Sequence, residues 1–156
     1  MPIEPADAAI LAELQDDGRL TNQDLAARVG LSASPCWRRV RQMEETGVIA
    51  GYRAVVDRRK VGLGVMAFVR VKIDSHSEAE AKAFENDVQR LDDVVACYSI
   101  AGSADFMLQV VAADLDAYAD FAMNVIRRLP RIKEMETAIV LKEVKPLTGW
   151  PVTPRR

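Results

Sequence analysis

The sequence has little of several residue types on which common catalytic and metal sites depend. It contains one histidine, His76, and two cysteines, Cys36 and Cys97, in 156 residues. His76 lies in a polar stretch with no cysteine nearby, so we expect no metal site. The two cysteines are far apart in sequence. We interpret them as two buried thiols in a reducing cytoplasm, with redox sensing as the alternative.

Long apolar runs are also missing. No run of about 18 apolar residues occurs, so we expect no membrane span. The first residues lack a basic segment followed by an apolar one, which argues against a secretory signal and favours a cytoplasmic location. With one histidine, no glycine-rich phosphate loop and no nucleophile paired with a base, the sequence does not indicate an enzyme.

The overall charge does not indicate a nucleic-acid partner, but its local distribution does. The chain has 21 basic and 23 acidic residues, and a hydrophobic content of 49% is typical of a globular protein. Between Leu25 and Met43 there is no Asp or Glu, whereas that stretch contains Arg28, Arg38, Arg39 and Arg41. Such a concentration of positive charge suits a phosphate backbone.

The first sixty residues predict three short helices. Apolar residues at helical spacing indicate a helix over about 6–16, with Gly18 as its stop. Thr21 is expected to cap a second helix, and Asp24 forms an imperfect capping box with it because Asp is shorter than the usual Glu. Gly30 can adopt positive φ and end this second helix.

A third helix is expected directly after a tight turn. Ser32 or Ser34 can cap it, Pro35 suits its first turn, and Gly47 ends it. Its apolar stripe faces inward while most of its arginines do not. Three helices with this turn describe a helix-turn-helix, which binds DNA through the third helix. A solvated charged helix in a plain three-helix domain is the alternative.

The second half changes to a period of two. The expected elements, in chain order, are a strand at 65–73, a helix at 78–91, a hairpin of strands at 94–100 and 106–111, a helix at 118–129 closed by Pro130, and a strand at 132–144 with Met135, Thr137, Ile139 and Leu141 on one face. This β-α-β-β-α-β order predicts a ferredoxin-like fold, so the chain is expected to be α+β.

The predicted organisation is a DNA-binding domain at 1–57, a linker at 58–64 and a second domain at 65–156. Helices should cover one face of the sheet. The other face, which includes Phe68, needs a partner, and a second copy packed face to face would cover it. We therefore expect a homodimer at least. A ferredoxin-like fold alone does not establish ligand binding, so a purely dimerising role stays open.

Two stretches carry a family resemblance. The run Leu31-Ser32-Ala33-Ser34-Pro35-Cys36-Trp37-Arg38-Arg39-Val40, followed by Gly47-Val48-Ile49-Ala50-Gly51-Tyr52, resembles the Lrp/AsnC, or feast/famine, regulators. The segment Leu14–Arg19 and the second half are also similar, so the resemblance covers nearly the whole chain. It implies a transcription regulator with a winged-helix-like helix-turn-helix and a RAM-type ligand-binding domain.

The resemblance also implies particular DNA contacts. The third helix would enter the major groove, and Cys36 would pack inside the domain. The residues expected nearest the bases are Ser32, Ala33, Ser34, Trp37 and Arg38. Arg39 and Arg41 are expected nearer the backbone, and Thr21, Pro35 and Gln42 complete the expected contacts. The sequence does not assign which residue contacts bases and which contacts phosphates.

An amino-acid effector is implied at a loop that usually reads Gly-x-Tyr-Asp in the family. Gly102 and Asp105 match, whereas Ala104 replaces the ring. Asp105 could pair with an α-amino group or fix the turn. On the last strand Met135 replaces the usual Thr, while Thr137 is kept. The expected effector-binding residues are Tyr98, Gly102, Ser103, Ala104, Asp105, Met135, Glu136 and Thr137.

Family members pair through this second domain and often assemble dimers into octamers, so the resemblance implies the same here. It implies no cofactor beyond the effector, and a nucleoid-associated protein in the cytoplasm. An architectural protein that wraps DNA without an effector shares every N-terminal feature and is the alternative function.

Overall fold

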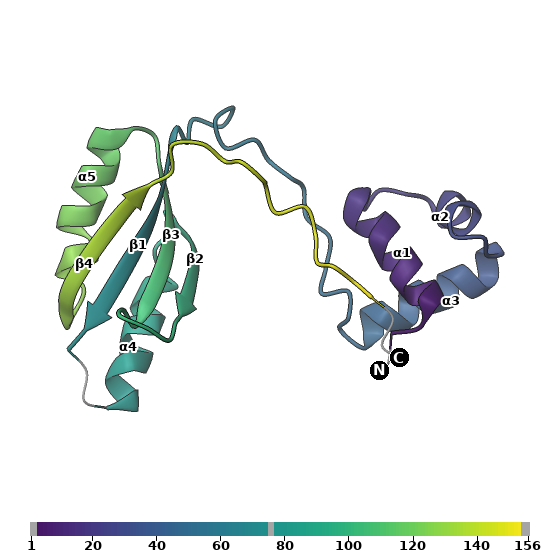
Figure 1. Ribbon diagram of the computed structural model, residues 1–156, viewed down its shortest axis with the longest axis horizontal. Helices are drawn as coiled ribbons and strands as arrows, with labels where there is room; N and C mark the ends of the chain where they lie inside the picture. Colours follow the sequence, from purple (N-terminus) through teal and green to yellow (C-terminus); the bar gives the residue numbers. More distant parts are fainter. Residues whose placement is uncertain (1–2, 75–76, 154–156) are drawn as a thin grey trace. The chain divides into compact units, whose positions relative to one another are not determined.

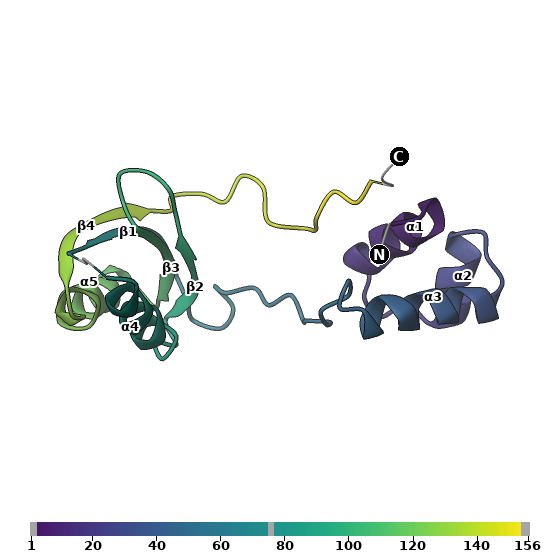
Figure 2. The same ribbon diagram turned by 90° about the horizontal axis from the view of Figure 1, so that it is seen from below.

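The computed structural model describes residues 3–74 and 77–153, which form two compact units (Figures 1 and 2). The first unit combines the N-terminal part up to Val55 with the tail from Val144, and the second runs from Val56 to Glu143. His76, Arg155 and Arg156 lie outside the described residues.

The first unit is built on three helices, as predicted. They are α1 (Pro5–Asp16), α2 (Asn22–Arg28) and α3 (Ala33–Glu45). Each helix contributes apolar side chains to a common core, because its apolar residues recur every three or four positions. The buried members of this core are Ile10, Leu11, Leu25, Ala26, Cys36 and Met43.

Glycines end two of these helices by adopting the left-handed conformation. Gly30 follows α2 with φ of 69° and Gly47 follows α3 with φ of 74°. The prediction for Gly18 was wrong in its cause. Helix α1 ends at Asp16 with Asp17 as an extended cap, and a Cβ on Gly18 would lie 3.3 Å from the Tyr52 ring. Close packing therefore explains this glycine.

The second unit is a four-stranded antiparallel sheet covered on one face by helices (Figures 1 and 2). The strand order is β2-β3-β1-β4, which confirms the ferredoxin-like fold. Its elements are β1 (Val65–Ile73), α4 (Glu78–Val88), β2 (Val94–Ser99), β3 (Phe106–Ala112), α5 (Leu115–Asn124), a 3-10 turn η1 (Ile126–Arg128) and β4 (Ile132–Ile139).

The predicted alternation in β1 decides which sheet face packs on the helices. Val69 and Val71 are fully buried, and they lie opposite Leu108 and Phe106 of β3. Phe84 of α4 completes this layer, with its ring centroid 4.7 Å from that of Phe106. Residues on the other parity, among them Phe68 and Arg70, form what we call the open face. Within residues 56–74 and 77–143, helices α4 and α5 both lie on the opposite face of the sheet (Figure 2).

Several predicted boundaries in the second unit were wrong. Helix α4 ends at Val88 instead of residue 91, and α5 ends at Asn124 instead of residue 129, with the 3-10 turn η1 following it. The predicted helix at 118–129 begins earlier, because the Asp114 side chain accepts from the Ala117 N–H at 2.8 Å and caps α5. The predicted last strand ends at Ile139 instead of residue 144. Val140 still donates to the carbonyl of Met66, but Leu141, which we expected on the strand, is exposed.

The tail leaves the sheet and packs with the first unit. Residues 144–153 group with the three helices, and Val152 packs against their core. The predicted domain ranges had placed this tail entirely in the second domain. Two connections therefore join the units along the chain, one near residues 56–64 and one near 140–144.

Candidate functional site

Hydrogen bonds at the start of α2 cap that helix and tie it to α3. Thr21 accepts from the N–H of Asp24 at 3.1 Å, so the predicted N-cap is confirmed. The short Asp24 side chain reaches the Thr21 hydroxyl, at 2.6 Å. Asn22 donates to the carbonyl of Ala33 at 2.8 Å, which ties the start of α2 to the start of α3. The bond from Asn22 therefore links the starts of the two helices.

Helix α3 begins without a side-chain cap. Ser32 is the N-cap residue, in agreement with one of the two alternatives, but its side chain makes no capping bond. The first-turn N–H groups are thus left for another acceptor, and a helix N-terminus favours an anion such as phosphate. Pro35 lies in this first turn, as predicted.

Most of the predicted DNA-contact residues on α3 are exposed. Trp37 has 51% of its surface accessible, although aromatic side chains are usually buried in a small domain. Pro35 and Arg39 are half-buried. The other predicted DNA-contact residues are exposed: Ser32, Ala33, Ser34, Arg38, Arg41 and Gln42, together with Thr21 at the start of α2.

The exposed arginines of α3 differ in their surroundings. The Arg41 Nε lies 2.9 Å from a carboxylate oxygen of Glu45, and its guanidinium carbon lies 5.4 Å from the Trp37 ring centroid. Among residues 3–74 and 77–153, no side chain forms a salt bridge or hydrogen bond with Arg38. Arg38 is therefore the cation of α3 with the greatest freedom to reach another molecule.

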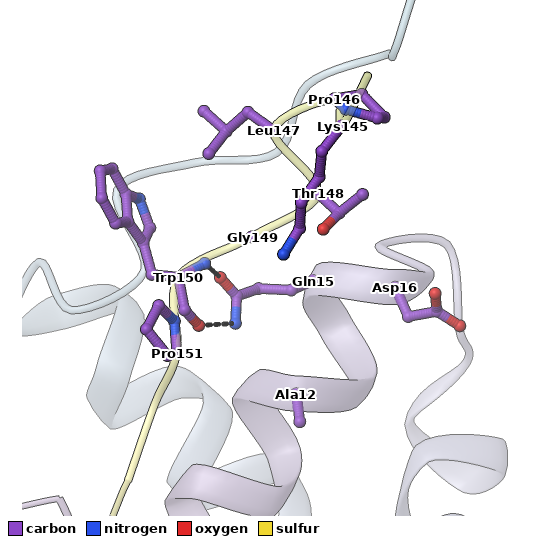
Figure 3. A pocket seen from close by; sticks show the side chains of 10 residues that line it. All are labelled: Ala12, Gln15, Asp16, Lys145, Pro146, Leu147, Thr148, Gly149, Trp150 and Pro151. Carbon is purple, nitrogen blue, oxygen red and sulfur yellow. Dashed lines mark hydrogen bonds between the residues drawn. The ribbon is translucent and has the colours of Figure 1, made fainter. Parts of the chain in front are cut away.

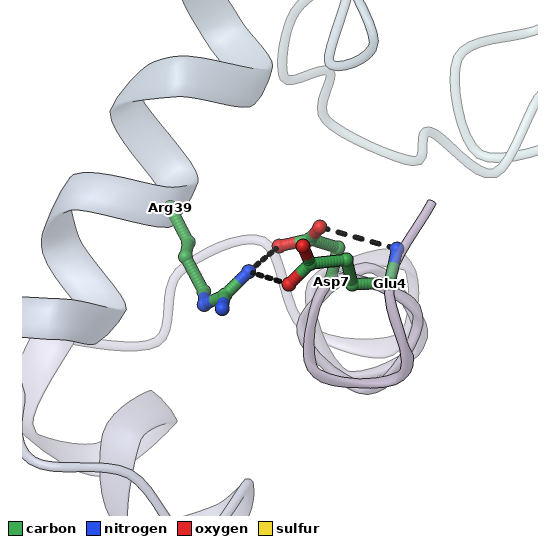
Figure 4. A network of polar contacts seen from close by, with 3 residues as sticks. All are labelled: Glu4, Asp7 and Arg39. Carbon is green, nitrogen blue, oxygen red and sulfur yellow. Dashed lines mark hydrogen bonds and ion pairs between the residues drawn. The ribbon is translucent and has the colours of Figure 1, made fainter. Parts of the chain in front are cut away.

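Arg39 points toward α1 instead (Figure 4). Its NH1 lies 2.9 Å from Asp7 and 2.9 Å from Glu4. The Asp7 side chain is only 6% exposed, and it also accepts from the backbone N–H of Glu4 at 3.3 Å. Hydrogen bonds to Asp7 and then to Glu4 raise the pKa of Arg39. This cluster holds α3 against α1, a contact that local sequence patterns did not reveal.

Tyr52 makes a second contact that the sequence reading missed. Its hydroxyl donates to Glu44 near the end of α3 at 2.9 Å. Desolvation of the hydroxyl, and then this hydrogen bond, raise the pKa of Tyr52 to about 12. The Gly51-Tyr52 pair after the third helix was the feature of the sequence that could have pointed to this residue. Tyr52 holds the chain that follows α3 against that helix.

The predicted effector loop lies between β2 and β3. Gly102 has φ of 149°, a conformation that favours glycine, and it is exposed together with Ser103. Ala104 is buried. The Asp105 carboxylate accepts from the N–H of Ile73 at 2.8 Å, and its own N–H donates to the carbonyl of Val71 at 3.0 Å. Asp105 thus ties the loop to the end of β1, beside the irregularity at Lys72/Ile73.

Strand register places the other predicted effector residues on two different faces. On the open face, one row of side chains crosses the sheet from Tyr98 through Met107 and Arg70 to Glu136. In this row the Arg70 NH2 lies 3.5 Å from a carboxylate oxygen of Glu136. Met135 and Thr137 lie on the helix-covered face.

Thr137 is engaged within the second unit itself. Its hydroxyl lies 2.5 Å from the hydroxyl of Tyr118 on α5. The predicted effector set therefore does not converge on one surface of a single subunit. Gly102, Ser103, Tyr98 and Glu136 are exposed, whereas Ala104 is buried and Asp105 is half-buried. On the helix-covered side, Met135 is half-buried and Thr137 is exposed.

The two cysteines have different environments. Cys36 is fully buried, as predicted, and burial raises the pKa of its thiol. Cys97 was predicted to be buried but is exposed, because β2 is an edge strand. It lines a cavity of about 360 Å³ between α4 and β2, where desolvation and then Glu85 raise the pKa of its thiol.

Neither a metal centre nor a membrane span is found in the described part of the chain. No group of His, Cys, Asp and Glu within residues 3–74 and 77–153 has the arrangement to hold a metal ion. No helix described there is both long and apolar enough to cross a bilayer.

Comparison with protein families assigns both units. The family model described as Lrp/AsnC ligand binding domain matches residues 66–150. The family model described as winged helix-turn-helix DNA-binding matches residues 3–50. The second match covers the three helices, and the first covers the sheet and continues into the tail as far as residue 150.

Similar proteins span almost the whole chain. A leucine-responsive regulatory protein of Rhizobium meliloti (strain 1021) is 40% identical over 143 residues, or 92% of each chain. The crystal structure of an AsnC family transcriptional regulator from Agrobacterium tumefaciens is 38% identical, with a TM-score of 0.90 over 95% of this chain and 96% of that one. A transcriptional regulator of Neisseria meningitidis, solved as a complex with L-Met, is 34% identical with a TM-score of 0.87, over 92% of this chain and 96% of that one.

Proposed function

We propose, since the chain belongs to the Lrp/AsnC family of DNA-binding transcription regulators, that α3 recognises a specific DNA sequence and that a small amino acid modulates this binding. One observation carries the proposal. Helix α3 presents an exposed cationic face, with Arg38 engaged by no described side chain, in a stretch without acidic residues from Leu25 to Met43. Such a face suits a DNA groove.

The DNA contacts are proposed to divide by exposure. Trp37, Arg38 and Ser34 have the freedom to approach bases, while Arg41 and the uncapped start of α3 suit phosphates. Arg39 acts through its clamp on Asp7 to hold α3 in place. The remaining proposed contacts are Thr21, Ser32, Ala33, Pro35 and Gln42.

The effector is proposed to be a small amino acid held between subunits. The Neisseria meningitidis relative was solved with L-Met, which supports this class of ligand. Exposed Gly102 and Ser103 would approach the ligand through their backbone, and Tyr98 and Glu136 would reach it from the open face. The bond from Ile73 to Asp105 supports a turn-fixing role for that carboxylate. Met135, Thr137 and buried Ala104 would shape the site from behind.

A homodimer through the open face is proposed as the working unit. Phe68 and Tyr98 are 37% and 57% exposed there, and a second copy would remove this apolar surface from water. Alternating polar residues such as Arg70 and Glu136 would pair across such an interface. Assembly of dimers into octamers and a nucleoid-associated place in the cytoplasm are proposed from the family likeness.

DNA recognition is tested by fluorescence anisotropy with duplexes from the region upstream of the protein's own gene. Arg38→Ala is compared with Arg90→Ala, which removes an exposed arginine of the second unit. A base contact by Arg38 predicts a loss of about 1–3 kcal/mol that depends on sequence. A phosphate contact predicts the same loss of affinity for every duplex sequence. It also predicts that the slope of log affinity against log salt concentration becomes shallower by about one. Equal binding by the two variants would refute the role of α3.

The effector is tested by thermal unfolding with each of the twenty amino acids. A ligand that binds only the folded state raises Tm by mass action. A rise with one amino acid, together with altered duplex affinity, supports the proposal. The absence of any rise favours the alternative, an architectural protein without an effector.

A further inference from the structure

The tail beyond the sheet, residues 145–152, lies against α1 of the DNA-binding unit (Figure 3), and we call it the strap. Together with Ala12, Gln15 and Asp16 of α1, its residues line a groove of about 760 Å³. The chain therefore contributes a segment from its far end to the domain formed by its first helices.

The side chain of one glutamine, Gln15, binds the backbone of the strap. The Gln15 side-chain oxygen accepts from the N–H of Trp150 at 2.6 Å, and its amide nitrogen donates to the carbonyl of Trp150 at 3.0 Å (Figure 3). Both polar groups of one peptide residue are thus satisfied by a single side chain, in the manner of a strand neighbour. This contact joins residues 135 positions apart in sequence.

The residue before Trp150 has to be small for this grip to form. A Cβ on Gly149 would lie 2.8 Å from the Gln15 side-chain oxygen and 3.2 Å from its Cβ. Gly149 does not have positive φ, so close approach alone explains the glycine. A side chain at this position would push Gln15 away from Trp150.

Apolar packing and two prolines support the same contact. Val152 packs against the core of the three helices, and it lines the same cavity as Leu14. Pro146 and Pro151 restrict the conformations of the free segment, so less entropy is lost when the strap docks. The strap is therefore held by the packing of Val152 at its far end and by the hydrogen bonds between Gln15 and Trp150.

Residues 140–144 connect the near end of the strap to the sheet. Strand β4 ends at Ile139, and Val140 still donates to Met66 of β1 at 2.9 Å. The other connection between the units is the segment 56–64, where Arg58 holds the turn through the carbonyls of Leu63 and Gly64. The DNA-binding unit is therefore attached to the second unit at two points, one on α1 and one after α3.

We propose that the strap determines half-site spacing, with Gln15 and Gly149 as its specificity-determining residues. One flexible connection would let a DNA-binding unit turn and meet half-sites at many spacings. A second attachment restricts that rotation. The two DNA-binding units of a dimer, one from each subunit, then match only half-sites that lie on the same side of the duplex. This inference rests on the proposed function, because it requires a dimer that binds DNA.

The test compares three duplexes: one with a single half-site, one with two half-sites in phase, and one with the second half-site shifted by about half a helical turn, or about 5 base pairs. Wild-type protein is expected to prefer the in-phase duplex by about ten-fold or more, through joint binding of both units. In Gln15→Ala and Gly149→Ala the preference is expected to fall to about three-fold or less. Binding to the single half-site stays at the wild-type level.

Two further variants make the outcome specific. Gly149→Ala acts by displacing Gln15, so the double variant with Gln15→Ala should match Gln15→Ala alone. Gln89→Ala, an exposed glutamine at the end of α4, should keep the wild-type preference.

Each contrary outcome has a distinct meaning. Wild-type spacing preference in both strap variants would overturn the role of the strap and leave the proposed function intact. A loss of single half-site binding in these variants would mean that the strap is needed for folding of the domain, and would also overturn the proposal. Wild-type protein that binds none of the duplexes would refute the proposed function, and the strap with it.

Discussion

Replacing Arg39 with methionine separates the clamp from DNA contact. The variant keeps most of the aliphatic stem but removes the guanidinium whose NH1 lies 2.9 Å from both Asp7 and Glu4. Asp7 then remains as a carboxylate with 6% of its side chain exposed and without its cation. We expect the first unit to lose stability, because a buried charge without a partner is poorly solvated.

The size of the loss follows from the exposure of the three groups. Breaking a fully buried ion pair costs about 3–5 kcal/mol, whereas an exposed pair contributes about 0–1 kcal/mol. Arg39 is 34% exposed and Glu4 is 59% exposed, so the contact to Glu4 contributes little. The loss is expected to be about 1–3 kcal/mol, between these two limits. Arg38→Met, which removes an exposed arginine of the same helix, should change stability by no more than about 0.5 kcal/mol.

Tryptophan fluorescence during urea unfolding measures this effect directly. Both tryptophans of the chain, Trp37 and Trp150, lie in the first unit, so their emission follows that unit. Asp7→Asn in the Arg39→Met background should recover part of the loss, since it removes the unpaired charge. An Arg39→Met variant with the wild-type urea midpoint, or one that the second substitution further destabilises, would refute the clamp.

Three other substitutions test separate parts of the structure. For Tyr52, a folded-state pKa of about 12, against an ordinary value of 10.0, means that its stabilising effect is complete below pH 10 and is lost as pH rises toward 12. The stability difference between wild type and Tyr52→Phe should shrink over that interval, and a constant difference would contradict the assignment. Leu108→Ala, at a position with no exposure, should destabilise the second unit by about 2–5 kcal/mol in far-UV circular dichroism, whereas a loss below about 1 kcal/mol would not fit a packed core. Phe68→Glu on the open face should shift sedimentation from dimer to monomer, and an unchanged dimer would exclude that face.

Local patterns predicted the sheet well, because burial in a strand alternates with every residue. The apolar positions of 65–73 matched the buried face of β1, and the hairpin followed from two apolar runs joined by the Gly102 turn. The helix-turn-helix was likewise predictable from its caps and glycines. Less local features were missed: α5 begins after a cap, Asp114, that lies four residues before Tyr118, the first position of the helical apolar pattern.

The contacts that organise the first unit were not predictable in this way. Arg39 lies 32 positions from Asp7, and Gln15 lies 135 positions from Trp150. No periodic pattern links such pairs, because the fold brings them together. The same holds for the effector loop, where the bond from Ile73 to Asp105 depends on how β1 meets the loop. Residue identity at the site could be read from sequence, whereas the partners of those residues could not.

The salt dependence of duplex binding tests the central claim most directly, that the exposed cations of α3 hold DNA. Binding of upstream duplexes is measured across a series of salt concentrations for wild type and Arg38→Ala. For wild type, affinity is expected to be measurable at low ionic strength and to fall linearly with the logarithm of salt concentration, as counterions are released from phosphates. For Arg38→Ala we expect lower affinity at every salt concentration. Wild-type protein with no affinity for any duplex at low ionic strength, or with an affinity that salt does not change, would contradict the account.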